Sequence, residues 1–216
     1  MSGVRKRPWD EAEKHLVRAD RRFAPLVDRH GPCKLRPYRD RFGMLVRSIV
    51  SQQISSKAAE TISGRLEALT GKGFEPARLL GLGEDQVRAC GLSGQKTRYV
   101  LGLAADVVEG RVRLHHLHKS DDETIIAELT KVKGIGRWTA EMFLIFSLNR
   151  PDVLPVDDLG IRNALRLFHG LEGAPTPKEC PVLTEPWRPY RTVAMWYLWR
   201  LLEDEAEKAG AKQSKS

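Results

Sequence analysis

The sequence predicts an all-α fold. Apolar residues recur every three to four positions along eight segments, which is the spacing that places them on one face of an α-helix. No segment alternates apolar and polar residues as a half-buried strand does, and no internal repeat is present. The eight segments cover approximately residues 42–50, 58–69, 84–90, 99–107, 125–129, 137–148, 158–169 and 189–207.

Serines and glycines mark the ends of the first four predicted helices. Ser55 and Ser93 precede two of them, and a serine hydroxyl accepts hydrogen bonds from the free amides of a first helical turn. Gly71, Gly91 and Gly110 follow three of them, and glycine readily adopts the left-handed backbone that ends a helix. These residues therefore predict short loops between the helices.

The fifth predicted helix begins with a different signal. Residues 120–123 (SDDE) have the pattern of a capping box, in which Ser120 is the N-cap and Glu123 bonds back to it. The sixth helix, over residues 137–148, follows after a short turn that contains two glycines.

A proline-containing connector, residues 149–157, separates the sixth and seventh helices. Pro151 and Pro155 hold the residues before them away from helical geometry, so we expect a connector of fixed shape. The predicted architecture is two helical subdomains flanking a cleft. The first comprises residues 40–155, and the second comprises residues 1–39 together with 156–216.

The composition favours a globular protein with an anionic partner. The 216 residues are 41% hydrophobic, which is enough to bury a sizeable core. Lysine and arginine number 36 against 28 acidic residues, for a net charge of +8. A basic balance favours nucleic acid or an acidic membrane surface, although a basic enzyme of another kind has the same composition.

Location is predicted from what the chain lacks. Its longest strongly apolar run, residues 142–146, is too short to cross a bilayer, so no membrane association is expected. No apolar segment follows Arg5, and we expect no signal peptide. The odd number of cysteines, Cys33, Cys90 and Cys180, suits free thiols in a reducing interior. We expect an intracellular protein, cytoplasmic if bacterial and nuclear if eukaryotic.

The turn before residue 137 is the most informative segment. Gly134 and Gly136 flank Ile135 and are followed directly by a helix, while Lys131, Lys133 and Arg137 add positive charge. Amides exposed at a helix N-terminus bind phosphate, and Ile135 would fill the space between the two helices. An ordinary turn between two helices remains the alternative.

Two adjacent aspartates follow the connector at the start of the seventh helix. Aspartate is a good N-cap, and we expect Asp157 to have that role. A carboxylate at Asp158 would lie near the positive end of the helix dipole. Such a fixed anion can stabilise positive charge that develops in a reaction, or orient a water molecule.

Two segments carry a resemblance to a known family: residues 132–140 (VKGIGRWTA) and 154–161 (LPVDDLGI). Together they resemble the helix-hairpin-helix base-excision DNA glycosylase superfamily. Residues 47–55 (RSIVSQQIS) and 186–191 (PWRPYR) are similar to its 3-methyladenine DNA glycosylase II family. The resemblance covers roughly residues 15–205 and places the helix-hairpin-helix at about 123–148.

The resemblance implies an enzyme that flips alkylated purines, such as 3-methyladenine or 7-methylguanine, out of duplex DNA and excises them. It implies that Asp158 is the catalytic carboxylate and that Gln53 fills the gap left in the duplex. Base-pocket positions are Trp138, Trp196 and Met142, the last standing where some relatives have tyrosine. The expected DNA contacts are Gln53, Lys133, Gly134, Ile135, Gly136, Arg137 and Lys96.

The resemblance also implies hydrolysis without strand cleavage. Superfamily members that cut the strand have a lysine two residues after the second hairpin glycine, and this chain has Trp138 there. No cofactor is required, although a structural Na⁺ or K⁺ ion on the carbonyls of Lys131, Lys133 and Ile135 is expected. The partner is duplex DNA with a damaged base, and we expect a monomer. Two alternatives remain: a non-catalytic DNA-binding or damage-sensing protein, and a glycosylase for other damaged or mismatched bases.

Overall fold

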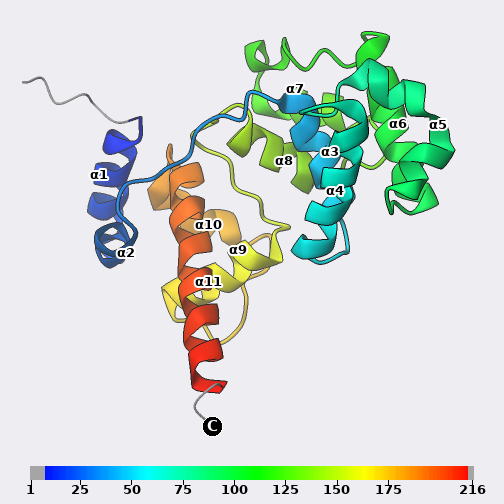
Figure 1. Ribbon diagram of the computed structural model, residues 1–216. Coiled ribbons are helices and arrows are strands. Elements are labelled where there is room, and N and C mark those ends of the chain that lie inside the picture. Colours follow the sequence, from blue (N-terminus) through cyan, green and yellow to red (C-terminus); the bar gives the residue numbers. More distant parts are fainter. Residues whose placement is uncertain (1–7, 214–216) are drawn as a thin grey trace, which may run out of the picture. The chain divides into compact units, whose positions relative to one another are not determined.

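A computed structural model describes residues 8–213 (Figure 1). These residues form helices and loops without any β-strand, so the all-α prediction is confirmed for them. The chain divides into two compact units. The central unit is Pro37–Leu148, and the terminal unit combines Met1–Arg36 with Asn149–Ser216.

Six α-helices build the central unit. They are α3 (Arg41–Ser51), α4 (Ser56–Thr70), α5 (Pro76–Ala89), α6 (Gly94–Val108), α7 (Asp122–Thr130) and α8 (Arg137–Phe146), with the short η1 (Leu117–Lys119) before α7. Helix α3 packs against α4, α6 and α8, while α5 lies along α6 and α7 along α8. The apolar face predicted for residues 42–50 is buried, including Leu45, Val46 and Ile49.

Two of the predicted caps in this unit are confirmed and one is wrong. Ser55 and Ser93 are the N-caps of α4 and α6, and each hydroxyl accepts from a first-turn amide. Helix α7 is capped by Asp121 rather than Ser120, because the Asp121 carboxylate accepts from the amide of Thr124 at 2.9 Å. Glu123 therefore does not take part in the predicted capping box, and its carboxylate pairs with Arg137.

Helix α5 starts eight residues earlier than the sequence pattern indicated. Glu75 caps it by accepting hydrogen bonds from the amides of Ala77 and Arg78, and Pro76 occupies its first turn. Gly83 interrupts the helix with a φ of 73°, which divides the apolar pattern into two short pieces. The sequence therefore predicted only the second piece.

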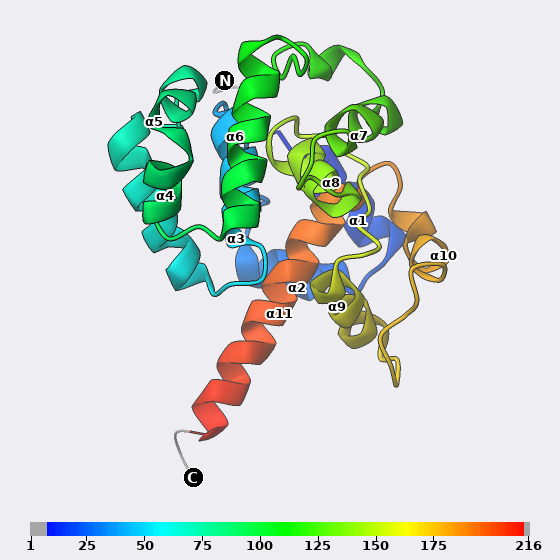
Figure 2. The same cartoon turned by 90° about the vertical axis from the view of Figure 1, so that its right-hand side faces the viewer.

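The terminal unit joins the two ends of the chain. Its elements are α1 (Asp10–Ala19), α2 (Phe23–His30), α9 (Leu159–His169), α10 (Cys180–Thr184), η2 (Glu185–Trp187) and α11 (Arg191–Gln213). Helix α11 packs against both α9 and α2, so segments from opposite ends of the sequence share one core (Figure 2). Phe23 of α2 lies 4.7 Å from Phe168 and 5.0 Å from Trp187, measured between ring centroids.

Helices α1, α2 and α10 were not predicted from the sequence. Helices α2 and α10 have only 8 and 5 residues, too few for a helical period to stand out.

Within residues 8–213, none of the helices has the length and apolar content needed for a bilayer span.

Candidate functional site

The hairpin between α7 and α8 requires glycine at one position only. Gly134 has a φ of +93°, and a Cβ atom there would lie 2.4 Å from Cδ2 of Tyr99. Gly136 has an extended backbone with a φ of −92°, and a Cβ atom there would have no neighbour within 4 Å. The fold itself therefore explains Gly134 but leaves Gly136 unexplained.

The start of α8 is suited to an anion. Its N-cap, Gly136, supplies no side-chain hydrogen bond to the first turn, where four amides lack an intrahelical partner. The helix dipole adds partial positive charge at the same end. Ile135 is 4% exposed, as expected for a residue that fills the space beneath the turn.

The three cations around the hairpin differ in their partners. Arg137 forms ion pairs with Glu123 at 2.5 Å and with Glu141 at 3.1 Å. Lys131 lies 3.5 Å from Glu128. Lys133 is exposed, and its ammonium has no carboxylate partner among residues 8–213. Of the three, Lys133 therefore has the least compensated charge.

The hairpin carbonyls expected to hold a monovalent cation are not used in hydrogen bonds within the described residues. The backbone oxygens of Lys131, Lys133 and Ile135 accept no hydrogen bond from the part of the chain that the structure describes. Neutral oxygen ligands of this kind suit a hard cation such as Na⁺ or K⁺. The neighbouring carbonyl of Gly134 differs, since it accepts a hydrogen bond from Gln52 Nε2 at 2.9 Å.

The turn between α3 and α4 presents Gln53. This side chain is exposed, and its residue has a φ of 56°, which is uncommon for an amino acid other than glycine. Lys96, expected to contact DNA, donates to the carbonyls of Val50 and Gln52, at 2.7 and 2.5 Å. Burial lowers the pKa of Lys96.

The three expected base-pocket residues have different environments. Trp138, in the first turn of α8, is 39% exposed. Met142, one turn later, is 5% exposed and belongs to the core of the central unit. Trp196 of the terminal unit is 7% exposed, and the Arg200 guanidinium lies 5.3 Å from the centroid of one of its rings.

Asp158, rather than Asp157, is the N-cap of α9. Its Oδ1 atom accepts from the amide of Ile161 at 2.9 Å, so the capping role expected of Asp157 was wrong. Asp157 is exposed, while Asp158 is partly buried. A Cβ atom on Gly160 would lie 2.9 Å from Asp158 Oδ1, so the absent side chain leaves room for the carboxylate. The sequence reasoning missed this role of Gly160.

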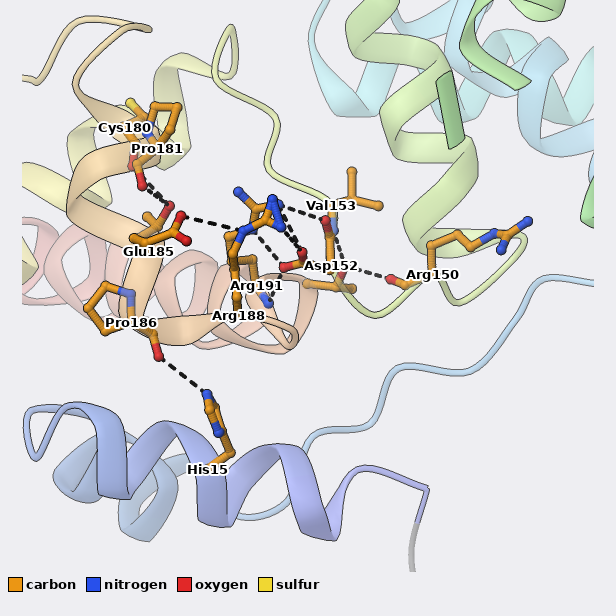
Figure 3. Close-up of polar contacts among 12 residues, drawn as sticks. His15, Arg150, Asp152, Val153, Cys180, Pro181, Glu185, Pro186, Arg188 and Arg191 are labelled. Carbon is orange, nitrogen blue, oxygen red and sulfur yellow. Dashed lines mark hydrogen bonds and ion pairs between the residues drawn. The ribbon is translucent and has the colours of Figure 1, made fainter. Parts of the chain in front are cut away.

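An ion pair anchors the connector before Asp158 (Figure 3). The Asp152 carboxylate accepts hydrogen bonds from Nε and Nη2 of Arg191 at 2.6 and 2.9 Å. Arg188 adds a third bond, from Nη1 at 2.8 Å. Because the Arg191 side chain is only 11% exposed, this pair is shielded from solvent far more than an ordinary surface ion pair.

Thr192 secures the connector at a second point. Its hydroxyl donates to the carbonyl of Arg150 at 2.6 Å and accepts from the amide of Val153 at 3.0 Å. Its own amide bonds to the carbonyl of Pro151 at 3.0 Å. The first turn of α11 thus holds residues 150–153, and Asp158 follows five residues later.

Arg191→Met should lower the free energy of unfolding by roughly 2–4 kcal/mol, because it leaves the Asp152 carboxylate without its main partner. Arg188→Met is the matched control. The Arg188 side chain is 47% exposed, and loss of such a pair should cost less than about 1 kcal/mol. Urea titration of the two variants measures the difference, and equal losses would contradict the anchoring role of Arg191.

The thiols are poor candidates for nucleophiles. Burial raises the pKa of Cys33 to about 12, and it also raises the pKa values of Cys90 and Cys180. Thiols with raised pKa values contain little thiolate at neutral pH. The described residues also contain no group of three or more His, Cys, Asp or Glu side chains that could hold a metal ion.

Comparison with known proteins identifies the family. Residues 46–189 match the family model of the HhH-GPD superfamily base excision DNA repair proteins. This match spans more than half of the chain, and the chain belongs to that family.

Three similar proteins illustrate the relationship. The chain is 37% identical over 196 residues to DNA-3-methyladenine glycosylase 1 of Schizosaccharomyces pombe. The aligned segment covers 88% of this chain and 86% of the relative. A solved structure of an S. pombe 3-methyladenine DNA glycosylase in complex with abasic DNA is 38% identical, with a TM-score of 0.77 over 88% of this chain and 95% of the other. A DNA-3-methyladenine glycosidase of Bacillus halodurans is 37% identical, with a TM-score of 0.80 over 92% and 93%.

Proposed function

We propose that this chain is a monofunctional DNA glycosylase that excises alkylated purines from duplex DNA in base excision repair. The observation that carries the proposal is 37% identity, over 88% of the chain, to a DNA-3-methyladenine glycosylase. The helix-hairpin-helix and the carboxylate at the start of α9 support it.

The hairpin binds the DNA backbone. The first amides of α8 and the uncompensated ammonium of Lys133 bind phosphate, and Gly136 allows a strand to approach closely. The target nucleotide must leave the stack, which costs a few kcal/mol. Gln53 enters the gap, and its amide bonds to the partner base.

Asp158 carries the chemistry. As the bond between C1′ and the base nitrogen breaks, its electron pair goes to the base and positive charge develops on the sugar. The Asp158 carboxylate stabilises this charge and orients a water molecule, which attacks C1′ and passes its proton to that carboxylate. The products are the free base and an abasic sugar.

Alkylated purines suit the aromatic surface at Trp138. Methylation at N3 or N7 makes the purine cationic, and a cation stacks favourably on an indole ring. The same purine leaves as a neutral base, so no strong general acid is needed. Met142, one turn after Trp138 on α8, is largely buried and adds apolar surroundings on that side. Trp196 of the terminal unit is also largely buried and stays a predicted base-pocket residue.

The chain is proposed to lack strand-cleaving activity. The position two residues after Gly136 is Trp138, which supplies no amine to attack the sugar. Lys133 lies on the other side of the two glycines. Water is therefore the nucleophile, and the strand stays intact at the abasic site.

A competition assay tests the proposal. Duplexes containing 3-methyladenine, 7-methylguanine, ethenoadenine, hypoxanthine or uracil are incubated with the protein, and released bases are separated by chromatography. We expect the methylated purines to be released fastest, with strand breaks only after alkali and no adduct trapped by borohydride.

Other outcomes identify the alternatives. Tight binding to damaged duplex without release of any base would indicate a non-catalytic DNA-binding protein. Release of another damaged or mismatched base alone would indicate a different glycosylase. A stable borohydride adduct would contradict the assignment of Trp138 to the position of the nucleophilic lysine.

A further inference from the structure

The turn between α3 and α4 is held in a strained backbone conformation. Gln53 has a φ of 56°, in the left-handed region that is unfavourable for a residue with a Cβ atom. Such a conformation persists only when the surrounding structure dictates it. The contacts that surround Gln53 are therefore informative about how the turn works.

Lys96 supplies the first of these contacts. Its ammonium, from the first turn of α6, donates to the carbonyl of Val50 at 2.7 Å and to that of Gln52 at 2.5 Å. Both carbonyls lie at the C-terminal end of α3, where the last oxygens lack helical partners and carry the negative end of the dipole. A single cation thus satisfies the backbone on the N-terminal side of Gln53.

Gln52 supplies the second contact. Its Nε2 atom donates to the carbonyl of Gly134 at 2.9 Å, so the turn is bonded directly to the hairpin. A pocket of about 270 Å³ lies at the turn, and its lining includes Gln53, Ile62, Ser93 and Lys96. Because this space is open, packing alone does not hold the turn in place.

We propose that Lys96 is a positioning residue for base opening: together with Gln52, it holds the turn so that the Gln53 side chain can enter the duplex. This inference rests on the proposed function, and it assigns Lys96 a role different from a phosphate contact. Two of the three N–H donors of its ammonium bond to the carbonyls of Val50 and Gln52, so at most one remains for a phosphate.

Paired and unpaired lesions provide the test. Lys96→Met keeps the aliphatic stem and removes the donor, so single-turnover excision of 7-methylguanine paired with cytosine should fall at least about tenfold. Excision of the same base opposite an abasic site should fall less than about threefold, since an unpaired base costs less to flip. Equal losses on both duplexes would overturn the proposal.

A double-mutant cycle with Gln53→Ala separates positioning from general weakening. Gln53→Ala should reproduce the same selective loss. Lys96→Met should add little to it, because both changes impair the same step, the entry of the Gln53 side chain into the duplex. Additive losses would overturn the proposal. Lys57→Met is the matched charge control. Lys57 is exposed and makes no side-chain hydrogen bond to any described residue, so this variant should excise at the wild-type rate.

Salt dependence distinguishes the phosphate contact. Loss of a phosphate-binding lysine lowers the slope of log affinity against log salt by about one, whereas loss of a positioning residue leaves that slope unchanged. A reduced slope for Lys96→Met, relative to the wild type, would overturn the proposal.

Fluorescence of 2-aminopurine beside the target base reports opening without chemistry. The rise in fluorescence on binding should be lost in Lys96→Met, and an undiminished rise would contradict the proposal. If neither the wild type nor the variants excise any base, the proposed function is refuted. The rise in 2-aminopurine fluorescence then tests the positioning role of Lys96 by itself. If Lys96→Met fails to fold, Gln52→Met removes the other half of the support and should cause the same selective loss.

Discussion

An Asp158→Asn variant should release alkylated base several hundredfold more slowly than the wild type, which corresponds to about 3 kcal/mol or more in the transition state. The reason is the loss of the negative charge that stabilises the sugar as it becomes positive. Asparagine is as good an N-cap as aspartate, so its side-chain oxygen should still accept from the Ile161 amide. The melting temperature and the affinity for abasic duplex should therefore remain near wild-type values.

Asp157→Asn is the matched control for this variant. It removes the same charge one residue earlier, from an exposed side chain, and should leave the single-turnover rate unchanged. Asp158→Ala should lose the cap as well, at an additional cost in stability of about 1 kcal/mol. Wild-type release by Asp158→Asn would show that another group is the catalytic carboxylate.

A Gly134→Ala variant should lose stability and DNA affinity together. The new Cβ atom would lie 2.4 Å from the Tyr99 ring, and the φ of +93° is strained for alanine, so the hairpin must move. Overpacking of this kind costs roughly 1–3 kcal/mol. Thermal unfolding and gel-shift titration with abasic duplex measure the two effects.

Gly136→Ala is the informative partner of that variant. Its Cβ atom has room and its backbone is extended, so the melting temperature should stay within a degree or two of the wild type, on the order expected for a surface substitution. DNA affinity should still fall, because the methyl group would occupy the space of the approaching strand. Full affinity in Gly136→Ala would contradict phosphate binding at this position.

Helical periodicity predicted much of the fold because long amphipathic helices carry a repeated signal. The segment over residues 42–50 and the serine caps at Ser55 and Ser93 are examples. The prediction was less successful where the signal is short or divided, as in α2 and in α5 with its break at Gly83. Adjacent acidic residues also compete for one cap, and sequence alone does not decide between them.

The chemistry at the site was less predictable because it depends on contacts between distant residues. A lysine that binds phosphate and a lysine that binds backbone carbonyls have the same appearance in a sequence, and Lys96 makes the second kind of contact. Arg137 was predicted to add positive charge at the hairpin, and the sequence did not indicate that Glu123, fourteen residues earlier, pairs with it. The role of Gly160 could have been suspected from its place two residues after Asp158.

The ion pairs of Arg137 also bear on how DNA association would proceed. Because α7 packs along α8 and Arg137 also links the start of α8 to Glu123 on α7, the two helices are already joined before any strand arrives. The entropy lost in ordering this turn is then part of folding and need not be lost again on association. A hairpin that is ordered in advance would let the protein bind successive stretches of duplex without ordering this DNA-contacting turn again each time.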